Sequence, residues 1–245
     1  MLKGICILPV IPMRKTKSNK SEMINQILFG ETFQIIKKIK NWSYIKLVHD
    51  GYEGWIDNKQ YKTIKTNITK YIICNKKNTN IKIYQICQPI VLGSLIPLNQ
   101  TFITKFKISH TLSFCEMAPF HTWFIKIAKK YLNSPYLWGG RTPLGIDCSG
   151  YTQIIYRLFN KQLPRDASEQ VNQGKKVLNI THAKLGDLAF FSKKESITHV
   201  GIYLGNNEII HASGKVRIDK LYEKGIFNKD SNSYTHILKT IKRVL

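Results

Sequence analysis

Residues 134–150 read SPYLWGGRTPLGIDCSG, and this segment decides how the C-terminal half of the chain is expected to fold. Its glycines and prolines predict a loop that ends at Asp147, a residue type favoured as the N-cap of a helix. The apolar residues that follow at helical spacing are Tyr151, Ile154, Ile155, Leu158 and Phe159. Cys148 is therefore predicted in the first helical turn, where unsatisfied N–H groups and the helix dipole favour a reactive thiolate. Taken alone, Cys148 fits a buried structural cysteine equally well.

The pattern around this segment predicts helices first and strands later. Apolar residues between Phe120 and Leu132 recur at helical spacing, which predicts a helix of about 13 residues. After the helix that begins at Cys148, the runs DLAFF (187–191), HVGIYLG (199–205) and EIIHAS (208–213) are typical of strands. Residues 116–245 are thus predicted to form an α+β domain.

Two histidines lie on neighbouring strands of a predicted hairpin. In HVGIYLG the apolar residues alternate, so a strand with one buried face places His199 on its other face. Gly205-Asn206-Asn207 predicts a hairpin turn, which returns the chain so that His211 lies within a rung or two of His199. One histidine would then accept the ring N–H of the other and fix its tautomer. Without Cys148, a chance pair of surface histidines explains this pattern better.

These features together resemble the NlpC family of bacterial cell-wall peptidases, also called the p60 family. A Trp-Gly-Gly loop before Cys148, Gly186-Asp187-Leu188 before a strand, and the two histidines follow the family's order over about residues 120–215. The resemblance implies a stripped-down papain-like fold and hydrolysis of the bond between γ-linked D-glutamate and a diamino acid. It implies Cys148 as nucleophile, His199 as base and later acid, and His211 as the orienting residue.

The N-terminal half is predicted to be all-β. Four runs in residues 1 to about 62 read as short strands of a small barrel: ICILPVI (5–11), ETFQIIKKIK (31–40), SYIKLVHD (43–50) and GYEGWID (51–57). The Gly30-Glu31 turn and the Gly54-Trp55 strand resemble a bacterial SH3-like domain. Residues 63 to about 115 repeat this texture in YIIC (71–74), IKIYQI (81–86), LGSLIPL (92–98) and TFITKFKI (101–108). The predicted architecture is two all-β SH3-like barrels, 1–62 and 63–115, followed by an α+β papain-like catalytic domain, 116–245.

This domain order resembles a narrower group of enzymes that cleave free murein peptides with an N-terminal L-Ala, after γ-D-Glu. In that group a closed acidic pocket holds the amino end of the substrate, and polymeric peptidoglycan is excluded. The residues that this resemblance suggests for substrate binding are Tyr136, Asp147, Ser149, Arg165, Asp166, Glu31 and Tyr52. Tyr136 is also suggested for the oxyanion site, together with N–H groups at the start of the Cys148 helix.

Some of these assignments have structural alternatives. Arg165 suits a substrate carboxylate, while Asp166 suits either a substrate ammonium or the N-cap of the segment ASEQVNQ. Glu31 fits a turn equally well, and Tyr52 fits packing on Trp55.

Lysine supplies most of the positive charge. The chain has 38 Lys and Arg residues against 15 Asp and Glu, a formal net charge of +23, but only six of the 38 are arginines. The lysines are scattered, and abundant Lys, Ile and Asn are typical of a genome rich in A and T. We therefore expect no specific nucleic-acid partner, although charge alone would permit polyanion binding.

Cysteine usage and hydropathy bound the compartment. Five cysteines without close pairs predict neither a disulfide framework nor a metal site. The first residues do not read as a signal peptide, and no stretch approaches the roughly 20 apolar residues that span a bilayer. We expect a soluble, cytoplasmic monomer whose partner is a murein peptide, with no membrane, metal or cofactor. The alternatives are a hydrolase of intact peptidoglycan with SH3-like wall anchors, or a binding protein without activity.

Overall fold

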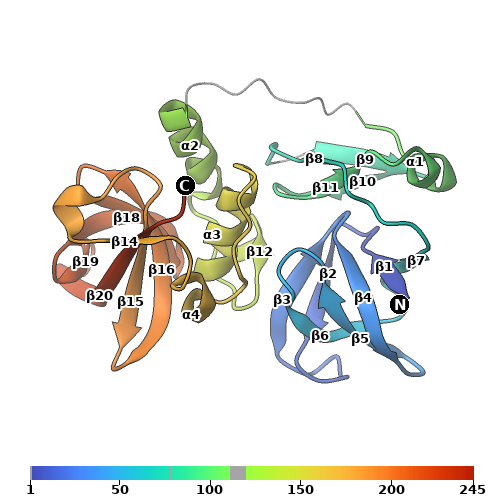
Figure 1. The fold of residues 1–245 in the computed structure, drawn as a ribbon, viewed down its shortest axis with the longest axis horizontal. Coiled ribbons are helices and arrows are strands. Elements are labelled where there is room, and N and C mark those ends of the chain that lie inside the picture. The colour runs from blue at the N-terminus through green and yellow to red at the C-terminus, as the bar shows by residue number, and fades with distance from the viewer. Residues whose placement is uncertain (1, 78, 111–119) are drawn as a thin grey trace. The chain divides into compact units, whose positions relative to one another are not determined.

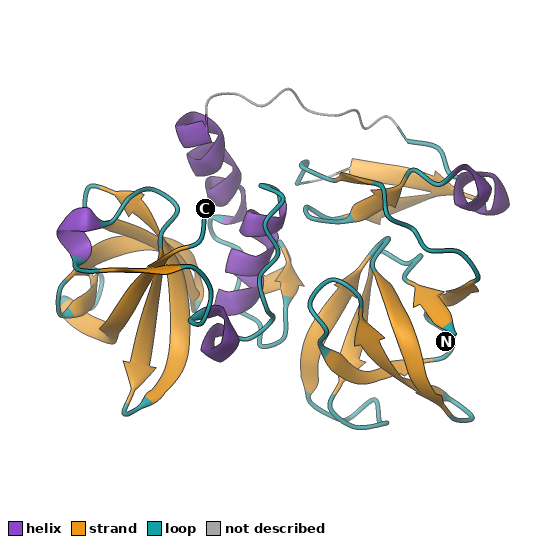
Figure 2. Ribbon diagram, viewed as in Figure 1, coloured by secondary structure: helices purple, strands orange, loops and turns teal. Residues whose placement is uncertain are grey.

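The computed structural model describes residues 2–77, 79–110 and 120–245, and strands dominate it (Figure 1, Figure 2). The chain divides into two compact units, Met1–Glu116 with Trp138–Pro143, and Met117–Leu137 with Leu144–Leu245. The segment Trp138–Pro143 lies in the loop predicted before Cys148, yet it belongs to the first unit.

A seven-stranded antiparallel sheet, in the order β3-β2-β6-β5-β4-β1-β7, forms the first part of the first unit (Figure 1). Its strands are β1 Lys3–Ile5, β2 Val10–Arg14, β3 Met23–Leu28, β4 Thr32–Lys38, β5 Trp42–Leu47, β6 Glu53–Asp57 and β7 Lys62–Ile64. Alternate residues are buried along β2, β5 and β6, so one face packs into a core that includes Met13, Phe33 and Ile45. This all-β organisation agrees with the prediction for residues 1–62.

The second part of the first unit departs from its prediction in two places. Its elements are β8 Tyr71–Ile73, β9 Thr79–Ile83, β10 Ile86–Ile90, β11 Leu95–Pro97 and helix α1 Gln100–Phe106, with β9 paired to β10 and β8 to β11. The strand predicted at TFITKFKI is wrong, because Asn99 caps a helix by accepting from Phe102 N, and Phe102 and Phe106 share its buried face. The single strand predicted at IKIYQI is wrong too, since Tyr84 and Gln85 adopt positive φ and form a turn between β9 and β10.

The two parts of the first unit share a core. Ile5 and Phe29, from the first part, pack in one apolar cluster with Ile72, Ile96 and Phe106 from the second. The strands of the second part form two separate two-stranded ladders, and the predicted second barrel is not confirmed.

A buried ion pair anchors the segment Trp138–Pro143 inside the first unit. Nη1 and Nη2 of Arg141, in β12 (Arg141–Thr142), each donate at 2.9 Å to an oxygen of Glu31, and both side chains are fully buried. The Arg141 amide also donates to Gln26 Oε1 at 2.7 Å. Gly139 has φ +75°, and a Cβ there would lie 2.4 Å from the Met23 carbonyl oxygen, so only glycine fits this approach.

We expect Arg141→Ala to lower the free energy of unfolding of the first unit by about 3–5 kcal/mol, because Glu31 would keep a buried charge without its partner. Urea unfolding followed by tryptophan fluorescence measures this, since Trp42, Trp55 and Trp138 belong to that unit. Lys46→Ala is the matched control: its 3.1 Å pair with Glu53 is exposed, and its loss should cost less than about 1 kcal/mol. Equal losses in the two variants would contradict the prediction.

The second unit is α+β, with its helices early and most of its strands late, as predicted. Its helices are α2 Phe120–Ala128, α3 Cys148–Arg157 and α4 Ala167–Gln170, with 3-10 turns at Lys129–Tyr131 and Ile180–His182. Its strands are β13 Gly145–Ile146, β14 Lys175–Val177, β15 Leu188–Lys193, β16 Ser196–Gly205, β17 Glu208–Ser213, β18 Lys215–Tyr222, β19 Gly225–Asn228 and β20 Ser233–Arg243. The large sheet has the order β14-β20-β15-β16-β17-β18-β19, and α3 packs against β16 and β17 (Figure 1).

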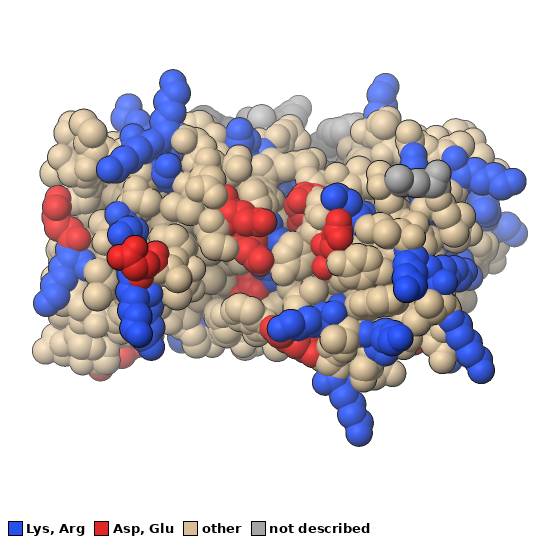
Figure 3. All heavy atoms as spheres, turned by 60° about the horizontal axis from the view of Figure 1, so that its bottom comes forward, with Lys and Arg blue, Asp and Glu red and all other residues tan. Residues whose placement is uncertain are grey.

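Charge and hydropathy of the folded chain bear on possible partners. On the face drawn in Figure 3, Lys and Arg side chains lie at many separate places and form no continuous patch. Among the helices that the structure describes, none combines the length and apolar character needed to cross a bilayer. The absence of a specific nucleic-acid partner stays a prediction.

Candidate active site

Cys148 is the first residue of α3, as the sequence predicted. Asp147 precedes it in extended conformation and caps the helix, its Oδ1 accepting from the Gly150 amide at 2.7 Å. Cys148 is 7% exposed, and its sulfur accepts hydrogen bonds from the backbone N–H groups of Val200, on β16, and Ser149. Helix α3 and strand β16 therefore meet at the sulfur atom.

The protonation of Cys148 differs from the expectation at a helix start. Burial raises the pKa of its thiol to about 12, and the neighbouring Asp147 charge acts in the same direction. The N–H groups of Val200 and Ser149 and the Arg165 charge act to lower this pKa but are outweighed. Without substrate, the thiol is therefore protonated at neutral pH.

Arg165 closes a buried polar cluster beside Cys148. Its guanidinium donates through Nη1 to Asp147 Oδ1 at 3.0 Å and to Ser149 Oγ at 2.9 Å, and through Nη2 to Asp147 Oδ2. All three side chains are nearly inaccessible to solvent. The pair neutralises the Asp147 charge and holds the cap of α3 in place. Binding of substrate by Asp147, Ser149 or Arg165 stays a prediction.

His199 and His211 form the predicted hairpin pair. Asn206 and Asn207 adopt positive φ between β16 and β17, as a tight hairpin turn requires. His211 lies opposite Gly201, two residues from His199 on the same face, and His199 Nε2 lies 2.8 Å from His211 Nδ1. A Cβ on Gly201 would come within 2.9 Å of the His211 Cβ, so glycine makes room for this approach.

Both imidazoles are neutral at pH 7. Burial lowers the pKa of His199 well below its ordinary value, and the nearby His211 and His236 act in the same direction. Burial also lowers the pKa of His211, although its bond to Asp219 opposes the shift. Because His199 Nε2 is engaged by His211, Nδ1 is the ring nitrogen that remains for a proton from a nearby thiol.

Three residues near this pair were not predicted from the sequence. Asp219 Oδ2 lies 3.0 Å from His211 Nε2, and Arg217 Nε lies 2.7 Å from the same oxygen. His236, on β20, packs its ring against His199 with centroids 4.2 Å apart. Arg217 and Asp219 alternate in the strand that follows His211, and this pattern could have predicted that both face the histidine pair. No local sequence pattern predicts that β20 lies near this site.

The remaining predicted residues have different surroundings. Tyr136 is 36% exposed, and burial raises its pKa to about 12, with Cys148 and Asp147 acting in the same direction. Asp166 stands at the N-cap position of α4, but its side chain makes no capping hydrogen bond. Glu31 is bound to Arg141, and Tyr52 packs against the core of the first sheet. Substrate contacts by these four residues stay predictions.

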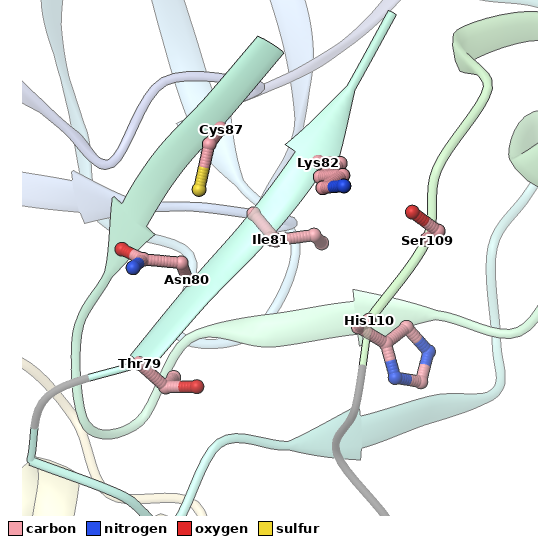
Figure 4. Close-up of a pocket in the computed structure, with 7 residues that line it drawn as sticks. All are labelled: Thr79, Asn80, Ile81, Lys82, Cys87, Ser109 and His110. Carbon is pink, nitrogen blue, oxygen red and sulfur yellow. The ribbon is translucent and has the colours of Figure 1, made fainter. Parts of the chain in front are cut away.

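Two further observations concern ligands. Within the described ranges, no group of three or more His, Cys, Asp or Glu side chains is arranged to hold a metal ion. A cavity of about 510 Å³ lies in the first unit (Figure 4) and is lined by Thr79, Asn80, Ile81, Lys82, Cys87, Ser109 and His110. It contains none of the residues proposed from the sequence.

Comparisons with known families agree with the predicted domain order. The model of the NlpC/P60 family matches residues 133–233, which include Cys148, His199 and His211. The model described as the bacterial dipeptidyl-peptidase Sh3 domain matches residues 13–60, the first predicted barrel alone.

Curated relatives and a solved structure extend this similarity along the chain. The γ-D-glutamyl-L-lysine dipeptidyl-peptidase of Bacillus subtilis is 41% identical over 211 residues, which cover 76% of this chain and 71% of the relative. The enzyme of the same name from Bacillus cereus is 30% identical over 232 residues, covering 80% and 68%. The crystal structure of an NlpC/P60 family protein from Bacillus cereus matches with a TM-score of 0.80 over 99% of both chains at 20% identity, which supports the fold.

Proposed function

This chain belongs to the NlpC/P60 family of peptidases, and on that premise we propose that it is a cysteine peptidase that cleaves between γ-D-glutamate and a diamino acid. The proposed substrates are free murein peptides that begin with L-Ala-γ-D-Glu, as arise when wall material is recycled in the cytoplasm. The relatives named γ-D-glutamyl-L-lysine dipeptidyl-peptidase support this specificity.

The observation that carries the proposal is the meeting of Cys148 with the strand that bears His199. The sulfur accepts a hydrogen bond from the backbone N–H of Val200, the residue that follows His199. His199 itself is hydrogen-bonded through Nε2 to His211. A cysteine nucleophile needs a base so oriented.

The proposed reaction proceeds through a thioester. His199 Nδ1 takes the thiol proton as Sγ attacks the γ-carbonyl carbon of the glutamate, and that proton passes to the departing amine of the diamino acid. Water then attacks the thioester, gives a proton to His199 and releases L-Ala-γ-D-Glu, which restores the thiol. Because Cys148 rests as a thiol with a raised pKa, deprotonation accompanies attack in this proposal.

The oxyanion of each tetrahedral intermediate needs donors near Sγ. The Gly150 amide is engaged by Asp147, so we assign this role to the Cys148 amide and the Tyr136 hydroxyl. Asp147 is paired with Arg165, and we keep Asp166 as a candidate to bind the substrate ammonium.

Cleavage of three substrates tests this function: L-Ala-γ-D-Glu-L-Lys-D-Ala, its N-acetylated form and intact sacculi. We expect release of L-Ala-γ-D-Glu from the first peptide, detected by mass spectrometry, and cleavage of the acetylated peptide slowed by about 10²-fold or more, because an acylated amine leaves its carboxylate partner unpaired. The same assay with meso-diaminopimelate in place of lysine identifies the diamino acid. Release of fragments from sacculi at a rate equal to that from free peptide would contradict the proposed restriction.

A further inference from the structure

A buried carboxylate ends the line of hydrogen bonds that begins at His199. Asp219 is 4% exposed on β18, and its Oδ2 lies 3.0 Å from Nε2 of His211. His211 Nδ1 in turn lies 2.8 Å from Nε2 of His199. The geometry points to Asp219 as a positioning residue that sets the tautomers of both histidines, an inference that rests on the proposed cysteine peptidase function.

The direction of each hydrogen bond follows from the chemistry of the carboxylate. An ionised carboxylate only accepts, so Nε2 of His211 carries a proton and donates it to Asp219. A neutral imidazole has one protonated nitrogen, so Nδ1 of His211 accepts, and Nε2 of His199 is the donor. The lone pair of His199 is then on Nδ1, where the proposed reaction needs it. A donor in place of Asp219 would reverse this sequence and put a proton on that nitrogen.

Arg217 keeps Asp219 ionised and in place. Its Nε lies 2.7 Å from Oδ2 and its Nη2 donates to Oδ1 at 2.8 Å, and the same Nη2 also lies 3.2 Å from Asn228 Oδ1 and 2.8 Å from Asp230 Oδ2. Burial acts to raise the pKa of Asp219, but the bonds from His211 and Arg217 outweigh it and hold this pKa below its usual value. The carboxylate therefore stays an acceptor at neutral pH.

The other titratable groups around His211 do not disturb this arrangement. His236, on β20, lies with its ring centroid 5.7 Å from that of His211, and burial followed by the His211 charge lowers its pKa to about 4. It is thus neutral at pH 7. The charged groups that act on the pKa of His211 are Asp219 and Arg217, both on β18, and the guanidinium is paired with the carboxylate.

Asp219→Asn tests the inference with little change in volume. An asparagine offers one acceptor and one donor where the carboxylate offers two acceptors, so part of the population places an N–H against His211 and holds His199 in the wrong tautomer. We expect kcat for the free-amine peptide to fall by about 10- to 100-fold, less than the roughly 10⁴-fold loss seen when the directly bonded triad carboxylate of a serine protease is changed in this way. KM should change little. The acid limb of kcat/KM should move to lower pH, because the Asp219 carboxylate no longer favours the protonated form of the hydrogen-bonded pair His211 and His199.

Glu208→Gln is the matched control. Glu208, on the strand that carries His211, pairs with Lys220 of β18 at 3.1 Å, but its side chain is 43% exposed and the pair lies outside the line from Asp219 to His199, so this variant should keep the wild-type kcat and pH profile. Equal loss in both variants, or an unchanged kcat and acid limb in Asp219→Asn, would overturn the inference. The proposed function is tested separately: it requires that the wild type cleave the peptide and that Cys148→Ala not do so. An inactive wild type would contradict the proposed function and not the role of Asp219.

Imidazole ¹⁵N chemical shifts of the unmodified protein give a second test, which needs neither activity nor a folded variant. The inference requires His211 and His199 each to carry a proton on Nε2 at pH 7. Protonation of His211 on Nδ1 would overturn it.

Discussion

Replacing Cys148 by alanine is expected to lower kcat/KM for L-Ala-γ-D-Glu-L-Lys-D-Ala by about 10⁴-fold or more, because the acyl intermediate of the proposed reaction forms on the Cys148 sulfur. The variant should fold, since a buried cysteine behaves as a small apolar side chain and alanine leaves the Asp147 cap unchanged. Dipeptide release followed by mass spectrometry measures the loss, and the far-UV circular dichroism of the two proteins should coincide.

The matched control is Cys87→Ala, because Cys87 is exposed on β10 in the first unit. The Cys87→Ala variant should cleave the peptide at the wild-type rate. Iodoacetamide labelling resolved by peptide mass spectrometry adds a measurement without substrate: Cys148 should react faster in the wild type than in His199→Gln. Substantial cleavage by Cys148→Ala would rule out the thioester route.

The local part of the site could be predicted from sequence because its signals are close together along the chain. A cap at Asp147 followed by helical periodicity is enough to place Cys148 at the start of α3. The pairing of His199 with His211 needs only an alternating strand, a two-asparagine turn and a returning strand. The sequence resemblance supplied the roles that these side chains play in the family.

Contacts that join distant segments could not be predicted in this way. Arg165 lies 18 residues from Asp147, and each reads alone as an ordinary polar residue, yet together they form a buried pair beside the thiol. His236 reaches His199 because β20 pairs with β15, which lies beside β16, an order of strands that no local pattern encodes.

Apolar runs without a clear period were misread for a related reason. TFITKFKI is rich in β-branched and aromatic residues and so resembles a strand, but the Asn99 cap and the shared buried face of Phe102 and Phe106 make it a helix. IKIYQI lacks glycine at its turn, and Tyr84 and Gln85 take positive φ, which non-glycine residues rarely do.

Replacing His199 by glutamine is expected to lower kcat/KM by about 10⁴-fold or more, because glutamine fills similar space but cannot accept the thiol proton and return it to the amine. Since nucleophile and base act as one unit, the double variant with Cys148→Ala should be no less active than the worse single variant. Losses that multiply instead would mean that His199 acts independently of the thiol.

The pH dependence of the wild type provides the complementary measurement on His199. The base must be neutral, and burial lowers its pKa well below 6.5, so kcat/KM should persist as the pH falls through 6.5 and decline only when it reaches the lowered pKa. His236→Phe is the control for simple packing, since it keeps an aromatic ring against His199 and should retain most of the activity. An acid limb at or above 6.5 would mean that the imidazole is not desolvated as the structure has it, and the base would then have to be sought outside this buried pair.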